Sequence, residues 1–171
     1  MSSAEPSAET SGVLPILSNV AQFLAHAIRL EQDAARRFED LSRIMESAGN
    51  REVERLFRRL AELSRLHLSS ATARGGFREL PQLSFDEFQW PDGVTPEAAG
   101  WRGVDAMLDV AGALQLALEG EQTGQAWYAG VARSARDPEV LAMAHEFAEE
   151  EAQHVSELER WIARYATNGQ N

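Results

Sequence analysis

The sequence contains no cysteine among its 171 residues. This absence excludes disulfides, zinc sites with thiolate ligands, iron–sulfur clusters and catalysis by a cysteine nucleophile. Long apolar runs are also missing, so no segment approaches the roughly 20 apolar residues that a membrane-spanning helix needs. No basic stretch precedes an apolar one near the N-terminus, as a secretory signal would require. The expected location is therefore the cytoplasm, with no membrane partner.

Basic residues are scarce. Lys and Arg total 16 against 27 Asp and Glu, which gives a formal net charge of −11. Binding to nucleic acid requires clustered cations that neutralise phosphates, so a nucleic-acid partner is not expected. Residues 1–12 are small and mostly polar and are predicted to form a disordered tail. The remaining chain, residues 13–167, is long enough to form one domain with a buried core.

Four segments show the apolar periodicity of amphipathic helices. The first is expected to begin at a Ser18 cap and stop at Gly49, and the second to run from an Asn50 cap to Gly75-Gly76. The fourth opens with Asp137-Pro138, a cap followed by a proline in the first turn. The third is marked by apolar side chains at helical spacing, namely Met107, Leu108, Ala111, Leu114, Leu118, Tyr128 and Val131.

The connections between these segments predict the topology. Links of a few residues join the first helix to the second and the third to the fourth, so each pair forms an antiparallel hairpin. A crossover of about residues 76–100 separates the two hairpins. We expect Phe77, Phe85, Phe88 and Trp90 to press it against the bundle. The predicted fold is an all-α four-helix bundle with one long crossover, which is the ferritin-like connectivity.

A weak internal repeat relates the two hairpins. An offset of 90 places Glu31 on Glu121, and an offset of 87 places His67 on His154. The second offset also aligns the helix caps Asn50 and Asp137. The chain therefore resembles one helical hairpin used twice, as two-fold metal sites in bundles often require.

Polar residues with metal-binding chemistry lie on the apolar faces of these helices. Glu31 and Glu121 occupy equivalent positions of the repeat, and a Glu facing a core is costly unless it is paired, protonated or bound to a metal. For a single Glu, a loose bundle that lets the carboxylate reach solvent would be the simpler explanation. Glu151 and His154 are three residues apart, so they project from one helix face toward the same point. His67 is the counterpart of His154.

The two-fold site expected in such bundles has one Glu from each of two helices and a Glu-x-x-His motif from each of the other two. Five of these six positions are filled here. The sixth, three residues before His67, is Ser64. Glu62 is not a ready substitute, because it lies about 140° around the helix from His67.

The segments AIRLEQDAARRF, LAELSRLH, ALEGEQTGQAWY and AEEEAQHVSELE together resemble the rubrerythrin-like branch of the ferritin-like superfamily. The resemblance implies two iron ions per chain, although Mn or another divalent metal is also possible. It implies that Glu31 and His67 hold one metal, that Glu121 and His154 hold the other, and that Glu151 bridges them. A homodimer is a further family-level expectation. Electrons would have to come from a separate protein or from Fe2+ itself, because the sequence contains no redox motif of its own.

The sequence also departs from that family. Ser64 stands where a second bridging carboxylate belongs, and Gly124 stands one turn after Glu121, where rubrerythrins often carry a further Glu. The iron–thiolate module of rubrerythrin is absent, since there is no cysteine. The leading interpretation is an oxidoreductase that acts on peroxide or O2 or oxidises Fe2+, a peroxidase or a ferroxidase. The alternative is a bundle with one metal or none that serves in binding or assembly, and iron storage in a shell is less favoured.

Three other residues receive structural interpretations. Tyr128 lies two turns after Glu121 and could hydrogen-bond the site or carry a radical, but core packing is the simpler role. His26 and His145 are not on the predicted apolar stripes, and His145 is expected at the surface.

The gap at Ser64 gives a direct test. Ser64→Glu is expected to tighten metal binding by restoring the second bridge, measured as the dissociation constant in a metal titration. Unchanged or weaker affinity would mean that Ser64 does not face the site.

Overall fold

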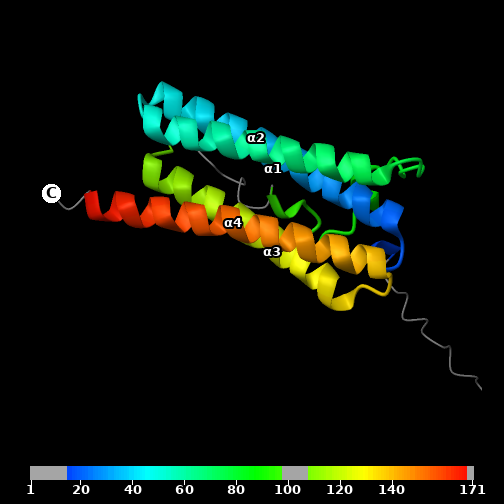
Figure 1. Cartoon of the computed structure of the whole chain (residues 1–171). Coiled ribbons are helices and arrows are strands. Elements are labelled where there is room, and N and C mark those ends of the chain that lie inside the picture. Colours follow the sequence, from blue (N-terminus) through cyan, green and yellow to red (C-terminus); the bar gives the residue numbers. More distant parts are fainter. Residues whose placement is uncertain (1–14, 98–107, 169–171) are drawn as a thin grey trace, which may run out of the picture.

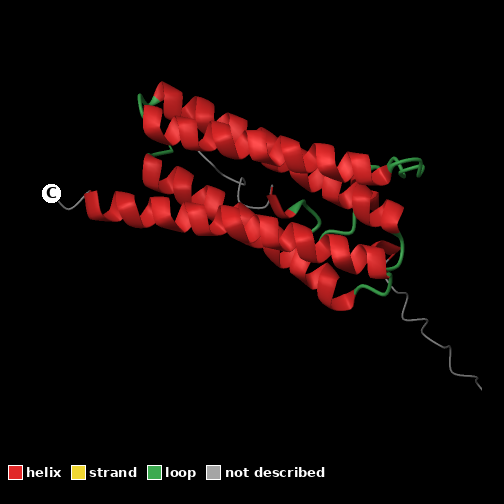
Figure 2. Cartoon of the chain, viewed as in Figure 1, coloured by secondary structure: helices red, strands yellow, loops and turns green. Residues whose placement is uncertain are grey.

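The computed structural model describes residues 15–97 and 108–168, and the predicted tail lies outside these residues. The described elements are a 3-10 turn η1 (Pro15–Leu17), helices α1 (Val20–Ser47) and α2 (Arg51–Gly75), a second turn η2 (Phe85–Glu87), and helices α3 (Val110–Ser134) and α4 (Pro138–Asn168). The four long helices run side by side, with α1 beside α2 and α3 beside α4 (Figure 1). In the described residues the regular structure is helical throughout (Figure 2), so the predicted all-α bundle of two hairpins is confirmed.

Side-chain caps place the helix ends close to the predicted positions. Asn50 Oδ1 accepts a hydrogen bond from Val53 N (3.0 Å), and Asp137 Oδ1 accepts from Val140 N (3.1 Å). The first helix is capped by Asn19, one residue after the predicted Ser18. The third helix begins later than the apolar pattern suggested, because Asp109 caps it and leaves Leu108 outside. Met107 lies outside the described residues.

Turn glycines allow the chain to reverse between helices. Gly49 has φ +73° and follows α1, and Gly76 has φ +54° and ends α2. These backbone angles are unfavourable for residues with a Cβ atom. Only residues 48–50 separate α1 from α2, and only residues 135–137 separate α3 from α4. Links this short require antiparallel neighbours.

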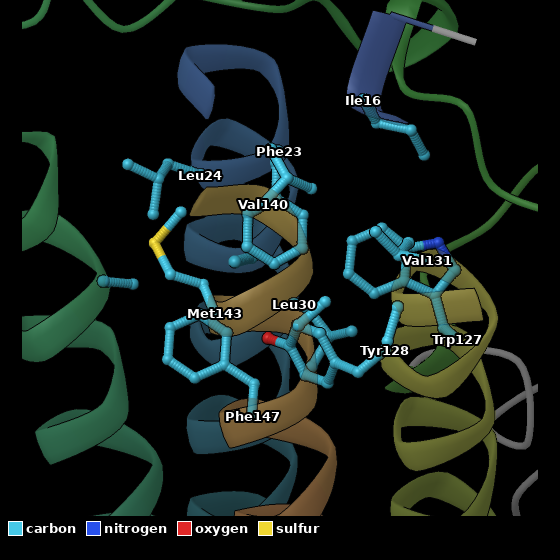
Figure 3. Close-up of a cluster of buried hydrophobic side chains, with 14 of the residues drawn as sticks. Ile16, Phe23, Leu24, Leu30, Trp127, Tyr128, Val131, Val140, Met143 and Phe147 are labelled. Carbon is cyan, nitrogen blue, oxygen red and sulfur yellow. The ribbon is translucent and has the colours of Figure 1, made fainter. Parts of the chain in front are cut away.

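The buried side chains form two apolar clusters along the bundle. One includes Phe23, Trp127, Tyr128 and Phe147 (Figure 3), with Phe23 and Phe147 ring centroids 6.1 Å apart. The other contains the apolar side chains from Phe38 onward on α1, up to Ala61 on α2, up to Leu118 on α3, and from Val155 onward on α4. On each helix the residues predicted to bind metal lie between the two clusters. The bundle therefore holds a polar layer between two apolar halves.

The crossover packs on the bundle through fewer aromatic residues than predicted. Trp90 is 7% exposed and Phe88 is partly buried. Phe77 and Phe85 are exposed, so their predicted packing role is wrong. Phe77 directly follows the turn at Gly76, and Phe85 begins the turn η2, whose residues are all outside the core.

His26 anchors the crossover to α1. Its Nδ1 lies 2.8 Å from the Gln22 carbonyl oxygen, and its Nε2 accepts a hydrogen bond from Gln89 N at 3.0 Å. The ring is fully buried and lies edge-on to Phe88 and Trp90, with centroids 5.1 and 5.0 Å away. Burial lowers the pKa of His26, although its backbone hydrogen bond opposes this shift. His26 is buried because the crossover covers a second face of α1, which the apolar stripes did not indicate, whereas His145 is exposed as predicted.

None of the helices within residues 15–97 and 108–168 combines the length and apolar character of a membrane-spanning segment.

Replacing His26 with Leu should lower the free energy of unfolding by about 1–3 kcal/mol, because the partly buried Gln89 N–H loses its acceptor. The measurement is denaturant unfolding of metal-free protein at pH 7.5, followed by circular dichroism. The exposed His145→Leu is the matched control and should change stability by less than about 0.5 kcal/mol. Equal effects of the two substitutions would contradict the anchoring role of His26.

Candidate metal centre

The polar layer of the bundle brings all five predicted ligands together. Glu31 comes from α1, His67 from α2, Glu121 from α3, and Glu151 and His154 from α4. Four of the five are at most 5% exposed, and His67 is partly exposed. Carboxylates are rarely buried this deeply unless they are paired or bound to a metal.

The ligand atoms form two groups that share one residue. Glu31, His67 and Glu151 offer atoms that all lie within 4.8 Å of one another. Glu121, Glu151 and His154 do the same. Glu151 therefore lies between the two groups, where a carboxylate could bind two cations at once. The side chains are grouped as the resemblance implies, and their binding of metal stays a prediction.

The two histidines face these carboxylates through the same ring nitrogen. His154 Nδ1 lies 2.9 Å from Glu121 Oε2 and 3.9 Å from Glu151 Oε2. His67 Nδ1 lies 3.7 Å from Glu31 Oε2. The two rings are parallel, with an interplanar angle of 5° and centroids 5.2 Å apart. The repeat seen in the sequence thus corresponds to a pseudo-symmetric pair of half-sites.

Burial and mutual repulsion dominate the electrostatics of the layer. Burial raises the pKa of Glu31 well above its ordinary value, and the charges of Glu121 and Glu97 add to the shift. The pKa of Glu151 is raised in the same way, by burial and then by Glu121 and Glu31. Burial also lowers the pKa of His67 to about 4, with help from the neighbouring His154. Neutral imidazole is the form that binds metals.

Glu121 behaves differently from its neighbours. Burial alone would raise its pKa, but the hydrogen bond with His154 and the charge of Arg37 outweigh burial and bring the pKa to about 2. Arg37 Nη2 donates to Glu121 Oε1 at 2.7 Å. Glu121 is therefore the carboxylate that is already ionised and oriented.

Several buried ligand atoms have no hydrogen-bond partner. Among the described residues these atoms include Glu31 Oε2, His67 Nδ1 and Glu151 Oε2. Each belongs to the shared groups described above. Buried polar atoms are nearly always satisfied in folded proteins, so three such atoms that converge on one layer form a place that could hold a cation. Carboxylate and imidazole donors together suit iron or manganese, and the residues present therefore fit a metal pair.

Tyr128 combines core packing with a contact to the site. Its ring is fully buried and lies 5.3 Å from the Phe147 ring, beside which Figure 3 shows it. Its hydroxyl donates to Glu31 Oε1 at 3.0 Å. Burial and the charge of Glu31 raise the pKa of Tyr128 well above its ordinary value, so the hydroxyl keeps its proton. The hydrogen bond fixes the orientation of a predicted ligand.

Ser64 is buried in the same layer, with 1% exposure, and its hydroxyl donates to the Leu60 carbonyl of its own helix at 3.1 Å. Glu62 is exposed, in keeping with its predicted position away from His67. Glu150 is partly exposed, and its Oε2 lies 3.6 Å from His67 Nε2. At this distance the carboxylate is not hydrogen-bonded to the ring, but its charge favours a proton on Nε2, which leaves Nδ1 free for a metal.

Two charged residues of the site escaped the sequence analysis. Arg37 and Glu97 form a buried ion pair, and both are at most 3% exposed. Arg37 stands in a charged run of α1, a pattern typical of solvated helix faces, and Glu97 lies in the crossover, where no periodicity assigns a face. The available signal was Gly120 and Gly124, one helical turn apart on the inner face of α3. A Cβ at Gly120 would collide with the Arg37 guanidinium.

Comparison with known proteins agrees with this geometry. The rubrerythrin family profile matches residues 22–72, which span most of α1 and α2. The structure is similar to the crystal structure of an uncharacterized conserved protein from Magnetospirillum magnetotacticum MS-1. Sequence identity is 37%, the TM-score is 0.71, and the match covers 84% of this chain and 93% of that one. No protein of curated function matches the chain significantly.

The match at 37% identity over nearly the whole of a related chain extends the family assignment beyond the first hairpin. The carboxylate–histidine layer and the long crossover agree with the same family assignment. The chain belongs to the rubrerythrin-like branch of the ferritin-like superfamily.

Proposed function

We propose that this protein is a two-iron oxidoreductase that acts on peroxide or O2 or oxidises Fe2+. The observation that carries the proposal is the sharing of Glu151 between two groups of potential ligands. Glu31 and His67 would hold one metal, and Glu121 and His154 the other. When bound, two Fe2+ ions would supply the two electrons that convert H2O2 and two protons into two water molecules.

The chain's own residues orient and shield this centre. The Tyr128 hydroxyl holds Glu31 through Oε1 and leaves Oε2 directed toward His67. Arg37 holds Glu121 through Oε1 and leaves Oε2 directed toward His154. Each terminal carboxylate is thus fixed by one oxygen and offers the other. Such support for ligands is a large part of metal affinity.

The alternative with a single metal has one observation in its favour. The group of Glu121, Glu151 and His154 is fully buried, whereas the group with His67 is partly exposed and lacks a carboxylate at Ser64. The second group would then bind more weakly. Metal stoichiometry separates the two possibilities, and initial rates with H2O2 and with Fe2+ plus O2 separate a peroxidase from a ferroxidase.

Protein purified without chelator is expected to contain close to two Fe or Mn ions per chain, measured by inductively coupled plasma mass spectrometry. Glu151→Gln should reduce both occupancies, because this residue belongs to both groups. The matched control is Glu149→Gln, an exposed carboxylate two residues away on the same helix, which should retain the wild-type content. No transition metal in wild-type protein after aerobic iron loading would refute the proposal.

Metal affinity should rise with pH. The pKa values of Glu31 and Glu151 are raised, so protons occupy these carboxyls at low pH and compete with the cation. Affinity for Co2+ is expected to weaken as pH falls from 8 to 6, with protons released on binding. Calorimetry in two buffers of different ionisation enthalpy measures that release. Binding without proton release over this range would contradict the protonated state of the two carboxyls.

A further inference from the structure

Glu97 is a buried carboxylate that comes from the crossover and not from any of the long helices. Its side chain has 0% exposure. Burial raises the pKa of Glu97 to about 8, although Arg37 opposes the shift. A carboxylate without solvent must find partners within the protein or a cation.

One side of Glu97 is held by Arg37. The guanidinium Nη1 pairs with Glu97 Oε2 and also donates to the Glu97 backbone carbonyl at 3.3 Å. The same guanidinium donates to Glu121 Oε1 through Nη2. Arg37 therefore links the end of the described crossover to a predicted metal ligand and fixes the position of both carboxylates.

The other side of Glu97 faces Gly124 on α3, at the edge of the metal centre. Glu97 Oε1 is buried and has no hydrogen-bond partner. It lies 2.7 Å from the point that a Cβ on Gly124 would occupy, and Glu151 Oε2 lies 3.8 Å from that same point. Oε1 therefore occupies space that any larger residue at position 124 would fill, and Glu151 Oε2, which belongs to both ligand groups, borders the same space.

We propose that Glu97 is a further metal ligand, acting through Oε1 on the cation held by Glu121, Glu151 and His154. The inference rests on the proposed function, since it requires that a metal binds. Ser64 leaves the five predicted ligands with only three carboxylates, and Glu97 supplies a fourth. Hard oxygen donors of this kind favour iron and manganese. The crossover thus contributes chemistry to the site in addition to covering it.

A purely structural role for Glu97, as counter-ion to Arg37, makes a different prediction. Removing the charge would then destabilise the bundle but leave metal affinity unchanged. Glu97→Gln preserves the size of the side chain and an oxygen that can accept from Arg37. Gly124→Ala leaves every ligand chemically intact, but its methyl group must displace Glu97 Oε1.

The test is a Co2+ titration followed by visible absorption, with circular dichroism as the check on folding. Glu97→Gln and Gly124→Ala should each weaken the affinity at one of two sites by about tenfold or more and change the Co2+ spectrum of that site. The controls are Glu119→Gln, an exposed carboxylate of α3, and Gly130→Ala, whose Cβ would only touch Arg133 Nη2 at 3.7 Å. Both controls should match the wild type.

The outcomes separate the two proposals. Wild-type affinity and spectrum in folded Glu97→Gln would overturn ligation by Glu97 and leave the metal centre standing. If Glu97→Gln does not fold, wild-type binding by Gly124→Ala would overturn the inference in the same way. Failure of the wild-type protein to bind Co2+ or iron would overturn the metal centre and the Glu97 inference together.

Discussion

The rest of the structure depends on four buried carboxylates in the middle of an apolar bundle, because their burial has to be compensated. Glu31, Glu97, Glu121 and Glu151 are each at most 3% exposed. Transferring an isolated ionised carboxylate out of water costs several kcal/mol even after relaxation. The described residues offset this cost in part through Arg37, Tyr128 and His154. The oxygens left without partners mark where protons or cations must complete the balance.

The two apolar clusters are what keep this polar layer in place. They lie on either side of it on all four helices, so each ligand is held between well-packed turns of its own helix. A polar layer alone would favour hydration and loosening of the bundle. Close packing above and below restricts the helices to one register, and that register brings Glu151 between the two half-sites.

The sequence predicted the fold and the helical part of the site because both follow from periodicity. The sequence alone places these residues on inner helix faces. The evidence is the spacing of Glu151 and His154, together with the offsets that pair Glu31 with Glu121 and His67 with His154. The five side chains do converge in the structure. The caps at Asn50 and Asp137 were equally readable, because capping depends on local chemistry.

The sequence did not predict what depends on the crossover. Its path has no period, so nothing indicated that Glu97 would be buried, that Phe77 would be exposed, or that His26 would be covered on a face of α1 away from the ligands. Arg37 was missed for a related reason. A charged residue next to Arg36 in a helix is normally solvated. Arg37 is buried because Gly120 on α3 leaves space for its guanidinium and because Glu97 of the crossover pairs with it.

The close approach of Glu97 to Gly124 also constrains how this chain can change over evolutionary time. Only 2.7 Å separates the Glu97 carboxylate oxygen from the place of a Cβ at position 124. The two positions therefore cannot drift independently. A descendant that gains a side chain at 124 must first shorten or redirect the one at 97, and an intermediate with both would be overpacked. In related sequences, this constraint would appear as correlated substitutions at positions 97 and 124.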